Sequence, residues 1–380
     1  MELKNLQRHI RTLATLPETD APVVSCYLAL DKGRVQNRNA FDEQIRPLIG
    51  SLSGQARRDF ENALGPIEKY LARELLPEAK GAAVFSRAGE QPLFLPLQFR
   101  VPLPNWVAMD RVPSVYHLVE LKDTYHRYVV MISTEQSVRI LEVNLGAVTE
   151  QVWRERPELR KRVGREWTKE HYQNHRRERT GRFIKEKVKI VDKLMSAGGY
   201  AHLILAGHPT ITTRVRDELP KHLLAKLIDI VPASGQTPVS DVVEATLASF
   251  IEQEEKESHA VATELERQIH AGGLAVAGTG PSFLALKRGR ADTLVLARSY
   301  APSQVWACTA CDLLDPDRDK PAKCPACGSA ELQELDVKEE LVRMAEQQGC
   351  SVEVVNESET LVQFGGVGCL LRYRLPEEYA

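Results

Sequence analysis

Apolar positions in the first third of the chain form two short runs separated by a helical pattern. Residues 23–30 and 81–85 are almost continuously apolar and rich in β-branched residues, which is typical of buried strands. A helical pattern over about residues 55–74 lies between them, and Gly65-Pro66 predicts a break in it. Prolines are frequent just after residue 100, so we expect this α/β region to end near residues 115–122.

The second region combines two strand patterns with a long amphipathic helix. Residues 128–133 and 138–143 predict strands, and residues 202–206 predict a buried strand that follows the helix. The helix is predicted by apolar residues at i, i+4, i+7 and i+11, namely Ile184, Val188, Val191 and Met195. One face of this helix should therefore belong to the core, and its Lys185, Lys189 and Lys193 should face away from it.

The last third repeats the α/β alternation. It opens at Gly272-Gly273 and predicts a helix ending near residue 289, a strand at 292–297, a helix at 337–348 and a strand at 351–355. With 380 residues and roughly 100–200 residues per domain, the length predicts two or three domains, and the three α/β regions favour three. Their predicted limits are 1–120, 121–262 and 263–380.

The composition is that of a globular protein. The chain is 43% hydrophobic and 27% charged, which excludes collagen-like, coiled-coil and wholly disordered chains. No apolar run approaches the roughly 20 residues that cross a bilayer, and the N-terminus has no signal-peptide pattern. We therefore expect a cytoplasmic protein with no membrane contact.

Positive charge is concentrated in residues 154–189. This segment holds fourteen Lys and Arg against six Glu, whereas the whole chain has a net charge of −2. Such asymmetry, with aromatic residues interleaved, favours binding to a polyanion such as RNA, and the alternative is a solvated helix with paired Glu and Arg. The predicted RNA-binding residues are Lys161, Arg162, Arg165, Trp167, Tyr172, Arg176, Arg177, Arg179 and Arg182.

Four of the seven cysteines have the spacing of a metal site. Cys308-x-x-Cys311 and Cys324-x-x-Cys327 are separated by twelve residues, and two such turns can close a tetrahedral site around zinc. Four protein ligands leave no open position, so we expect a structural zinc ribbon over residues 306–330. A pair of redox dithiols is the alternative.

The closing segment carries a resemblance to a known family. Phe364-Gly-Gly-Val-Gly-Cys-Leu-Leu-Arg-Tyr-Arg374 resembles the last strand of archaeal and eukaryotic class-1 release factors, and residues 183–195 with 203–207 resemble their middle domain. A zinc ribbon in the third domain is similar to that of archaeal members. The resemblance covers about residues 123–380 and suggests the bacterial branch of the class-1 release factor and Pelota family, which includes Balon-type members. It implies an α/β, three-domain, release-factor-like architecture.

The chain departs from that family at its catalytic loop. Release factors cleave peptidyl-tRNA with a Gly-Gly-Gln loop, which the family's spacing would place near residues 164–167, where only one glycine stands. Gln173 is the residue of this segment that could replace the missing Gln, and the alternative is a surface residue on a helix. No confident catalytic residue is predicted, and the resemblance favours a protein that is not an enzyme.

The resemblance implies a ribosome-binding translation factor that occupies the A site as a hibernation or rescue factor. Its implied partners are ribosomal RNA, a P-site tRNA and a translational GTPase. Its N-terminal domain would lie on the decoding side. Two alternatives stay open: a peptidyl-tRNA hydrolase with a divergent catalytic loop, and a zinc-ribbon scaffold whose basic segment binds an acidic protein.

Overall fold

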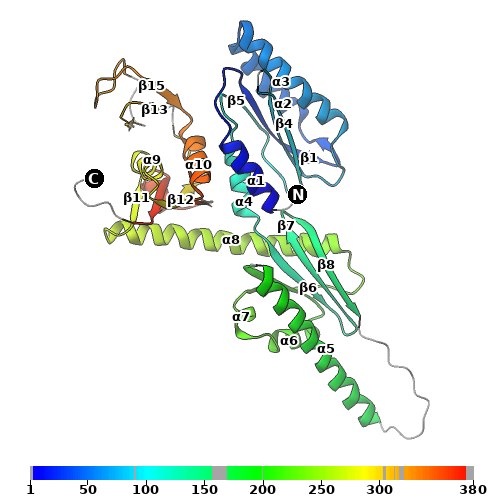
Figure 1. Cartoon of the computed structure of the whole chain (residues 1–380). Helices are drawn as coiled ribbons and strands as arrows, with labels where there is room; N and C mark the ends of the chain where they lie inside the picture. Colours follow the sequence, from blue (N-terminus) through cyan, green and yellow to red (C-terminus); the bar gives the residue numbers. More distant parts are fainter. Residues whose placement is uncertain are drawn as a thin grey trace. The chain divides into compact units, whose positions relative to one another are not determined.

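The computed structural model describes residues 3–89, 91–155, 169–198, 200–302, 305–311, 313–315 and 321–373. It divides the chain into two compact units (Figure 1). One unit combines residues 3–124 with residues 254–380, and the other comprises residues 125–253. The three predicted domain limits stay a prediction. No helix in the described ranges has the length and apolar character needed to cross a membrane.

The N-terminal part of the first unit is a five-stranded antiparallel sheet covered by helices. The strand order is β2-β1-β3-β4, and β5 also pairs with β1. The strands are β1 (Val23–Asp31), β2 (Arg34–Val35), β3 (Gly81–Arg87), β4 (Leu93–Phe99) and β5 (Trp106–Asp110). The helices are α1 (Leu3–Ala14), α2 (Arg38–Ser51), α3 (Gly54–Arg73) and α4 (Tyr116–Thr124).

The side chains of β1 alternate between two environments, as the pleat of a strand requires. Val24, Cys26 and Leu28 are buried against α2 and α3, which cover this face of the sheet (Figure 1). The neighbouring Tyr27 points to the other side, where its hydroxyl donates to the carbonyl oxygen of Ser114 at 2.6 Å. The predicted strands at residues 23–30 and 81–85 are confirmed.

The predicted break at Gly65-Pro66 is wrong, because α3 runs continuously from Gly54 to Arg73. The proline leaves the backbone carbonyl of Asn62, four residues earlier, without its helical donor, and Asn62 is exposed, so water can replace that donor. The buried face of α3, which includes Phe60 and Ile67, holds the helix against the sheet across the proline.

The second unit is a mixed sheet between two layers of helices. The strand order is β10-β9-β6-β7-β8, in which β10, β9 and β6 are parallel and the remaining pairs are antiparallel. The strands are β6 (Tyr128–Ser133), β7 (Ser137–Asn144), β8 (Ala147–Glu155), β9 (His202–Gly207) and β10 (Leu227–Pro232). The helices are α5 (Lys169–Gly198), α6 (Pro209–Asp217), α7 (Lys221–Leu224) and the first part of α8 (Val239–His270).

Alternate residues of β6 point to opposite faces of this sheet. Val129 and Met131 pack in a core with α5, α6 and α7, whereas Tyr128 and Val130 pack in a core with α8. The ring of Tyr128 stacks on that of Phe250, with centroids 4.4 Å apart. The predicted strands at residues 128–133, 138–143 and 202–206 are confirmed.

The C-terminal part of the first unit has its own four-stranded sheet, in the order β11-β17-β12-β16, and a small three-stranded sheet, in the order β14-β13-β15. The larger sheet consists of β11 (Ala275–Ala277), β12 (Ala291–Ala297), β16 (Ser351–Val355) and β17 (Val367–Leu371). The smaller sheet consists of β13 (Val305–Cys308), β14 (Leu314–Asp315) and β15 (Leu332–Leu335). The helices are α9 (Thr279–Lys287), α10 (Val337–Gln348) and α11 (Glu359–Gln363).

Helix α4 joins the two ends of the chain within the first unit. The buried carboxylate of Asp123 accepts the backbone N–H of Val354, at the edge strand β16, at 2.8 Å. Lys122 forms an ion pair with the buried Glu346 of α10, which also accepts the side-chain amide of Gln7 at 3.0 Å. The N-terminal and C-terminal parts therefore form one compact body.

Candidate functional site

The predicted RNA-binding residues belong to α5 and the segment before it. Lys161, Arg162, Arg165 and Trp167 lie outside the described residues. The backbone of α5 carries Tyr172, Gln173, Arg176, Arg177 and Arg179, whose side chains also lie outside the described part of the chain. Arg182 is described and is exposed. RNA contact by all of these residues, Arg182 included, and the role of Gln173 stay predictions.

The described part of α5 has one apolar face and one basic face. Ile184, Val188, Val191 and Met195 are buried in the core of the second unit, as their spacing predicts. Four cations are exposed at i, i+3, i+7 and i+11, which places them in one stripe along the helix. We call Arg182, Lys185, Lys189 and Lys193 the basic stripe. Glu186 is exposed beside it.

Lys187 interrupts the basic segment because it is buried. Its side chain is 1% exposed, and its ammonium group donates to Oγ of Ser133 at 2.9 Å and to the carbonyl oxygen of Thr134 at 2.7 Å. The ammonium group also lies 4.4 Å from the ring centroid of Phe183. Lys187 is one of the fourteen cations counted in residues 154–189, the segment predicted to bind RNA. Its buried ammonium group stabilises the end of β6 instead.

The four predicted cysteines converge in the small sheet. Their Sγ atoms all lie within 4.8 Å of one another. The Sγ distances are 3.6 Å between Cys308 and Cys327 and 3.5 Å between Cys311 and Cys324. Four sulfur ligands at about 2.3 Å from a tetrahedral zinc ion would lie about 3.8 Å apart, so the cluster fits such an ion.

Backbone N–H groups near Cys324 stabilise the thiolate form of its side chain. Burial would raise the pKa of this thiol, but hydrogen bonds from the backbone N–H groups of Cys327 and Ala326 and from the Cys311 and Cys327 side chains lower it to about 7. Burial and the neighbouring thiols instead raise the pKa values of Cys311 and Cys327. Thiolates are the form that binds metal ions. The cluster can therefore hold a metal ion, and nothing in its surroundings offers a fifth ligand among the described Cys, His, Asp and Glu residues.

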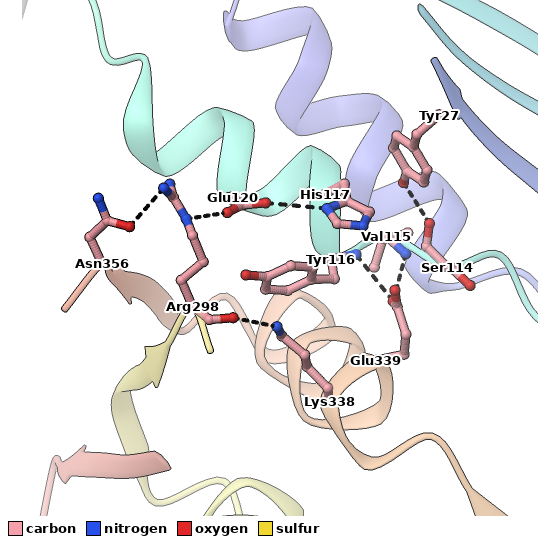
Figure 2. A network of polar contacts seen from close by, with 10 residues as sticks. All are labelled: Tyr27, Ser114, Val115, Tyr116, His117, Glu120, Arg298, Lys338, Glu339 and Asn356. Carbon is pink, nitrogen blue, oxygen red and sulfur yellow. Dashed lines mark hydrogen bonds and ion pairs between the residues drawn. The ribbon is translucent and has the colours of Figure 1, made fainter. Parts of the chain in front are cut away.

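A polar network that the sequence did not predict links α4 to α10 and β12 (Figure 2). Oε2 of Glu339 accepts the backbone N–H groups of Val115 and Tyr116, at 2.8 and 3.1 Å. Burial raises the pKa of Glu339 to about 8, despite these two hydrogen bonds. No local motif marks Glu339, because its partners lie more than 200 residues away in the chain.

A second arm of the network runs through Glu120. Its carboxylate contacts Nδ1 of His117 at 3.2 Å and accepts Nε of Arg298 at 2.7 Å, and Arg298 also donates to Asn356 at 2.8 Å (Figure 2). Burial alone would raise the pKa of Glu120, but His117 and Arg298 hold it below its ordinary value. The network fixes the two halves of this unit to each other.

Comparison with known proteins agrees with the resemblance in the sequence. Residues 113–250 match the sequence model described as Bacterial archaeo-eukaryotic release factor family 10. The chain is 29% identical over 231 residues to Peptide chain release factor subunit 1 of Pyrococcus abyssi, covering 54% of this chain and 56% of that protein. It therefore spans just over half the length of that relative.

A second relative aligns over almost the whole chain. Peptide chain release factor subunit 1 of Thermococcus kodakarensis is 23% identical over 415 residues, covering 98% of both proteins. Among solved structures, Pelota of Archaeoglobus fulgidus is similar at 12% identity with a TM-score of 0.37, covering 98% of this chain and 92% of that one. Residues 113–250 are therefore similar to the bacterial archaeo-eukaryotic release factor family, and the whole chain is similar to archaeal peptide chain release factor subunit 1.

Proposed function

We propose that this protein is a ribosome-binding factor that occupies the A site as a hibernation or rescue factor. The observation that carries the proposal is the basic stripe of α5, which lies within the segment that matches the family. The archaeal relatives are named as peptide chain release factors, so a ribosomal partner is the natural polyanion for this stripe.

The electrostatics of the stripe suit a phosphate backbone. Arg182, Lys185, Lys189 and Lys193 are exposed and form no ion pair with the described residues. Each cation placed against an RNA phosphate releases counterions, so the affinity should fall steeply with salt.

The sequence argues against ester hydrolysis as the main activity. It contains no Gly-Gly-Gln tripeptide, and the loop position near Gly164 has a single glycine followed by Arg165 and Glu166. Glycines give a loop the backbone freedom to enter a crowded catalytic centre, and a charged side chain cannot replace that freedom. We infer that this factor occupies the A site without releasing a peptide.

The four-cysteine cluster would hold zinc as a structural ion. Cys308, Cys311, Cys324 and Cys327 supply four sulfur ligands, and zinc would tie the polar segment between the two cysteine pairs to the small sheet. A translational GTPase as delivery partner stays a prediction, which a pull-down with purified elongation factors would test.

Co-sedimentation with bacterial ribosomes on sucrose gradients tests the proposal. We expect the protein in the ribosomal fractions at low salt and its loss at high salt. A double variant of the stripe, Lys185→Glu with Lys189→Glu, should remain in the supernatant. The matched control is Arg216→Glu with Lys221→Glu, which changes two exposed cations of α6 and α7 off the stripe.

A peptide-release assay separates the proposed role from hydrolysis. Ribosomal complexes carrying labelled peptidyl-tRNA should bind the protein without releasing peptide. Peptide release that is lost on Gln173→Ala would show the hydrolase instead. Absence of the wild-type protein from ribosomal fractions in every condition, including nutrient stress, would favour the zinc-ribbon scaffold.

A further inference from the structure

Three connected hollows run along the first unit beside the segment that leads from β15 into α10. The largest has a volume of about 590 Å³ and is lined by Trp106, Tyr116, Tyr300 and residues 334–339. A second, of about 580 Å³, is lined by Asp110, Thr309 and residues 330–334. A narrow hollow of about 50 Å³ shares lining residues with both, so the three hollows adjoin one another and are treated as one groove.

The lining of this groove is strongly acidic. Its described residues include seven carboxyl groups and three cations, and because the pKa of Glu339 is about 8, about three negative charges remain in excess at neutral pH. Two of the cations already have partners, because Arg343 is paired with Glu340 at 2.7 Å and Lys338 donates to the carbonyl oxygen of Arg298. We call this surface, with Glu18, Asp110, Glu331, Glu334 and Asp336 exposed along it, the acidic groove.

The negative charges of Asp336 and Glu18 act on Asp110 within the groove. Partial burial of its carboxylate raises the pKa of Asp110, and the negative charges of Asp336 and Glu18 raise it further. The hydrogen bond from the backbone N–H of Arg111 acts in the opposite direction. Glu18 lies near the N-terminus and Asp336 in the C-terminal part of the chain, so folding brings their like charges together here. A bound cation would relieve this repulsion.

One wall of the groove adds aromatic surface to the negative charge. Trp106, Tyr116 and Tyr300 line the largest hollow, and the ammonium group of Lys338 already lies 3.8 Å from the ring centroid of Tyr116. The protein thus places a cation of its own on one ring of this wall. Trp106 is partly exposed beside the acidic residues, and tryptophan is the best side chain for receiving a cation on its face.

We propose that the acidic groove binds an extended, arginine- and lysine-rich polypeptide segment of a partner protein. A guanidinium or ammonium group would enter the hollow lined by Trp106, Glu334 and Asp336, and further cations would follow the carboxylates toward Asp110 and Glu331. The groove repels nucleic acid, because its excess charge has the sign of a phosphate. Its two larger hollows, of about 590 and 580 Å³, favour several residues of a peptide over one small cation. This inference is independent of ribosome binding.

Fluorescence anisotropy with labelled nona-arginine tests the proposal on the full-length protein. We expect saturable binding, no binding of nona-glutamate, and binding weakened at least about threefold by Glu18→Gln with Glu334→Gln, because two carboxylates that would pair with the peptide are then neutral. The matched control is Glu43→Gln with Glu357→Gln, which removes the same charge from exposed positions outside the groove. Equal weakening by both pairs would overturn the proposal.

Carbodiimide crosslinking to nona-lysine locates the contact without relying on a variant. Crosslinks mapped by mass spectrometry should fall on Glu18, Glu331 and Glu334, whereas crosslinks confined to Glu43 and Glu357 would overturn the proposal. Displacement of nona-arginine by spermine at equal total charge would indicate a small-polyamine site and overturn the extended peptide. A dimer in sedimentation analysis that Glu18→Gln with Glu334→Gln dissolves would identify a second copy as the occupant, against a partner protein.

Discussion

Oε2 of Glu339 lies 2.8 Å from the backbone nitrogen of Val115, a residue 224 positions earlier in the chain. The contact places a carboxylate from the first turn of α10 at the N-terminal end of α4, where unpaired N–H groups require acceptors. Asp336 and Lys338 are the charged groups that act most strongly on this carboxylate. Its protonation state should therefore affect the stability of the whole first unit.

Replacing Glu339 by glutamine should change how stability depends on pH. The pKa of Glu339 is about 8 in the folded protein and near 4.5 in an unfolded chain, so the folded state binds a proton that the unfolded state releases between these values. The stability of the wild-type protein should fall as pH rises from 5 to 8, by at most about 1.4 kcal/mol per pH unit from this group.

The glutamine side chain keeps an oxygen for the two N–H groups and has no proton to lose. Glu339→Gln should therefore match the wild-type protein near pH 5 and become progressively more stable than it toward pH 8. Urea unfolding at a series of pH values measures the difference. Two parallel stability profiles would contradict the assignment of a raised pKa.

Lys187 should contribute to the stability of the second unit and not to RNA binding. Lys187→Met leaves Oγ of Ser133 and the carbonyl oxygen of Thr134 without this donor, which should lower the free energy of unfolding by about 1–3 kcal/mol. Lys185→Met, at an exposed position two residues earlier, should change it by less than about 0.5 kcal/mol. Equal effects of the two variants in thermal unfolding would contradict the buried role.

Gly207 should not tolerate a side chain. A Cβ atom at this position would lie 2.3 Å from the carbonyl oxygen of Ser133, where β9 and β6 run side by side. Gly207→Ala should destabilise the protein by about 3 kcal/mol, because backbone must move to admit the methyl group. Gly181→Ala, in open space on α5, should instead stabilise it by up to about 1 kcal/mol. Denaturant midpoints compare the two, and a stable Gly207→Ala variant would be incompatible with this strand packing.

The cysteine cluster should bind one zinc ion per chain. Elemental analysis of the purified protein should find that ion, and Cys308→Ser with Cys311→Ser should remove it, because two ligands do not retain zinc against dialysis. Cys350→Ser is the control, since Cys350 is a buried cysteine that donates to the carbonyl oxygen of Ala291 outside the cluster. Full metal content in the double variant would refute the four-sulfur site.

The sequence predicts those parts of the fold that depend on local patterns. Period and spacing identify the buried face of α5 through Val188 and Val191, and the twin Cys-x-x-Cys motifs identify the metal cluster. The break at Gly65-Pro66 is a wrong prediction, because tertiary packing of α3 overrides the local preference of proline.

Hydrogen bonds between residues far apart in the chain cannot be predicted from local sequence patterns. The bonds from Val354 to Asp123 and from Val115 to Glu339 each join residues more than 200 positions apart, so no local pattern shows that the two ends of the chain form one unit. Lys187 is misread for a related reason. Its position, four residues after Phe183 and four before Val191, lies on the buried face of α5, and the structure shows that its ammonium group reaches Ser133.

The salt dependence of ribosome binding tests the central claim most directly. The dissociation constant should be measured over a series of salt concentrations for the wild-type protein, for Lys185→Glu with Lys189→Glu, and for Arg216→Glu with Lys221→Glu. We predict a steep dependence for the wild type and the control, and a logarithmic slope about two units shallower for the stripe variant. An unchanged dissociation constant and slope in the stripe variant would contradict RNA binding by α5.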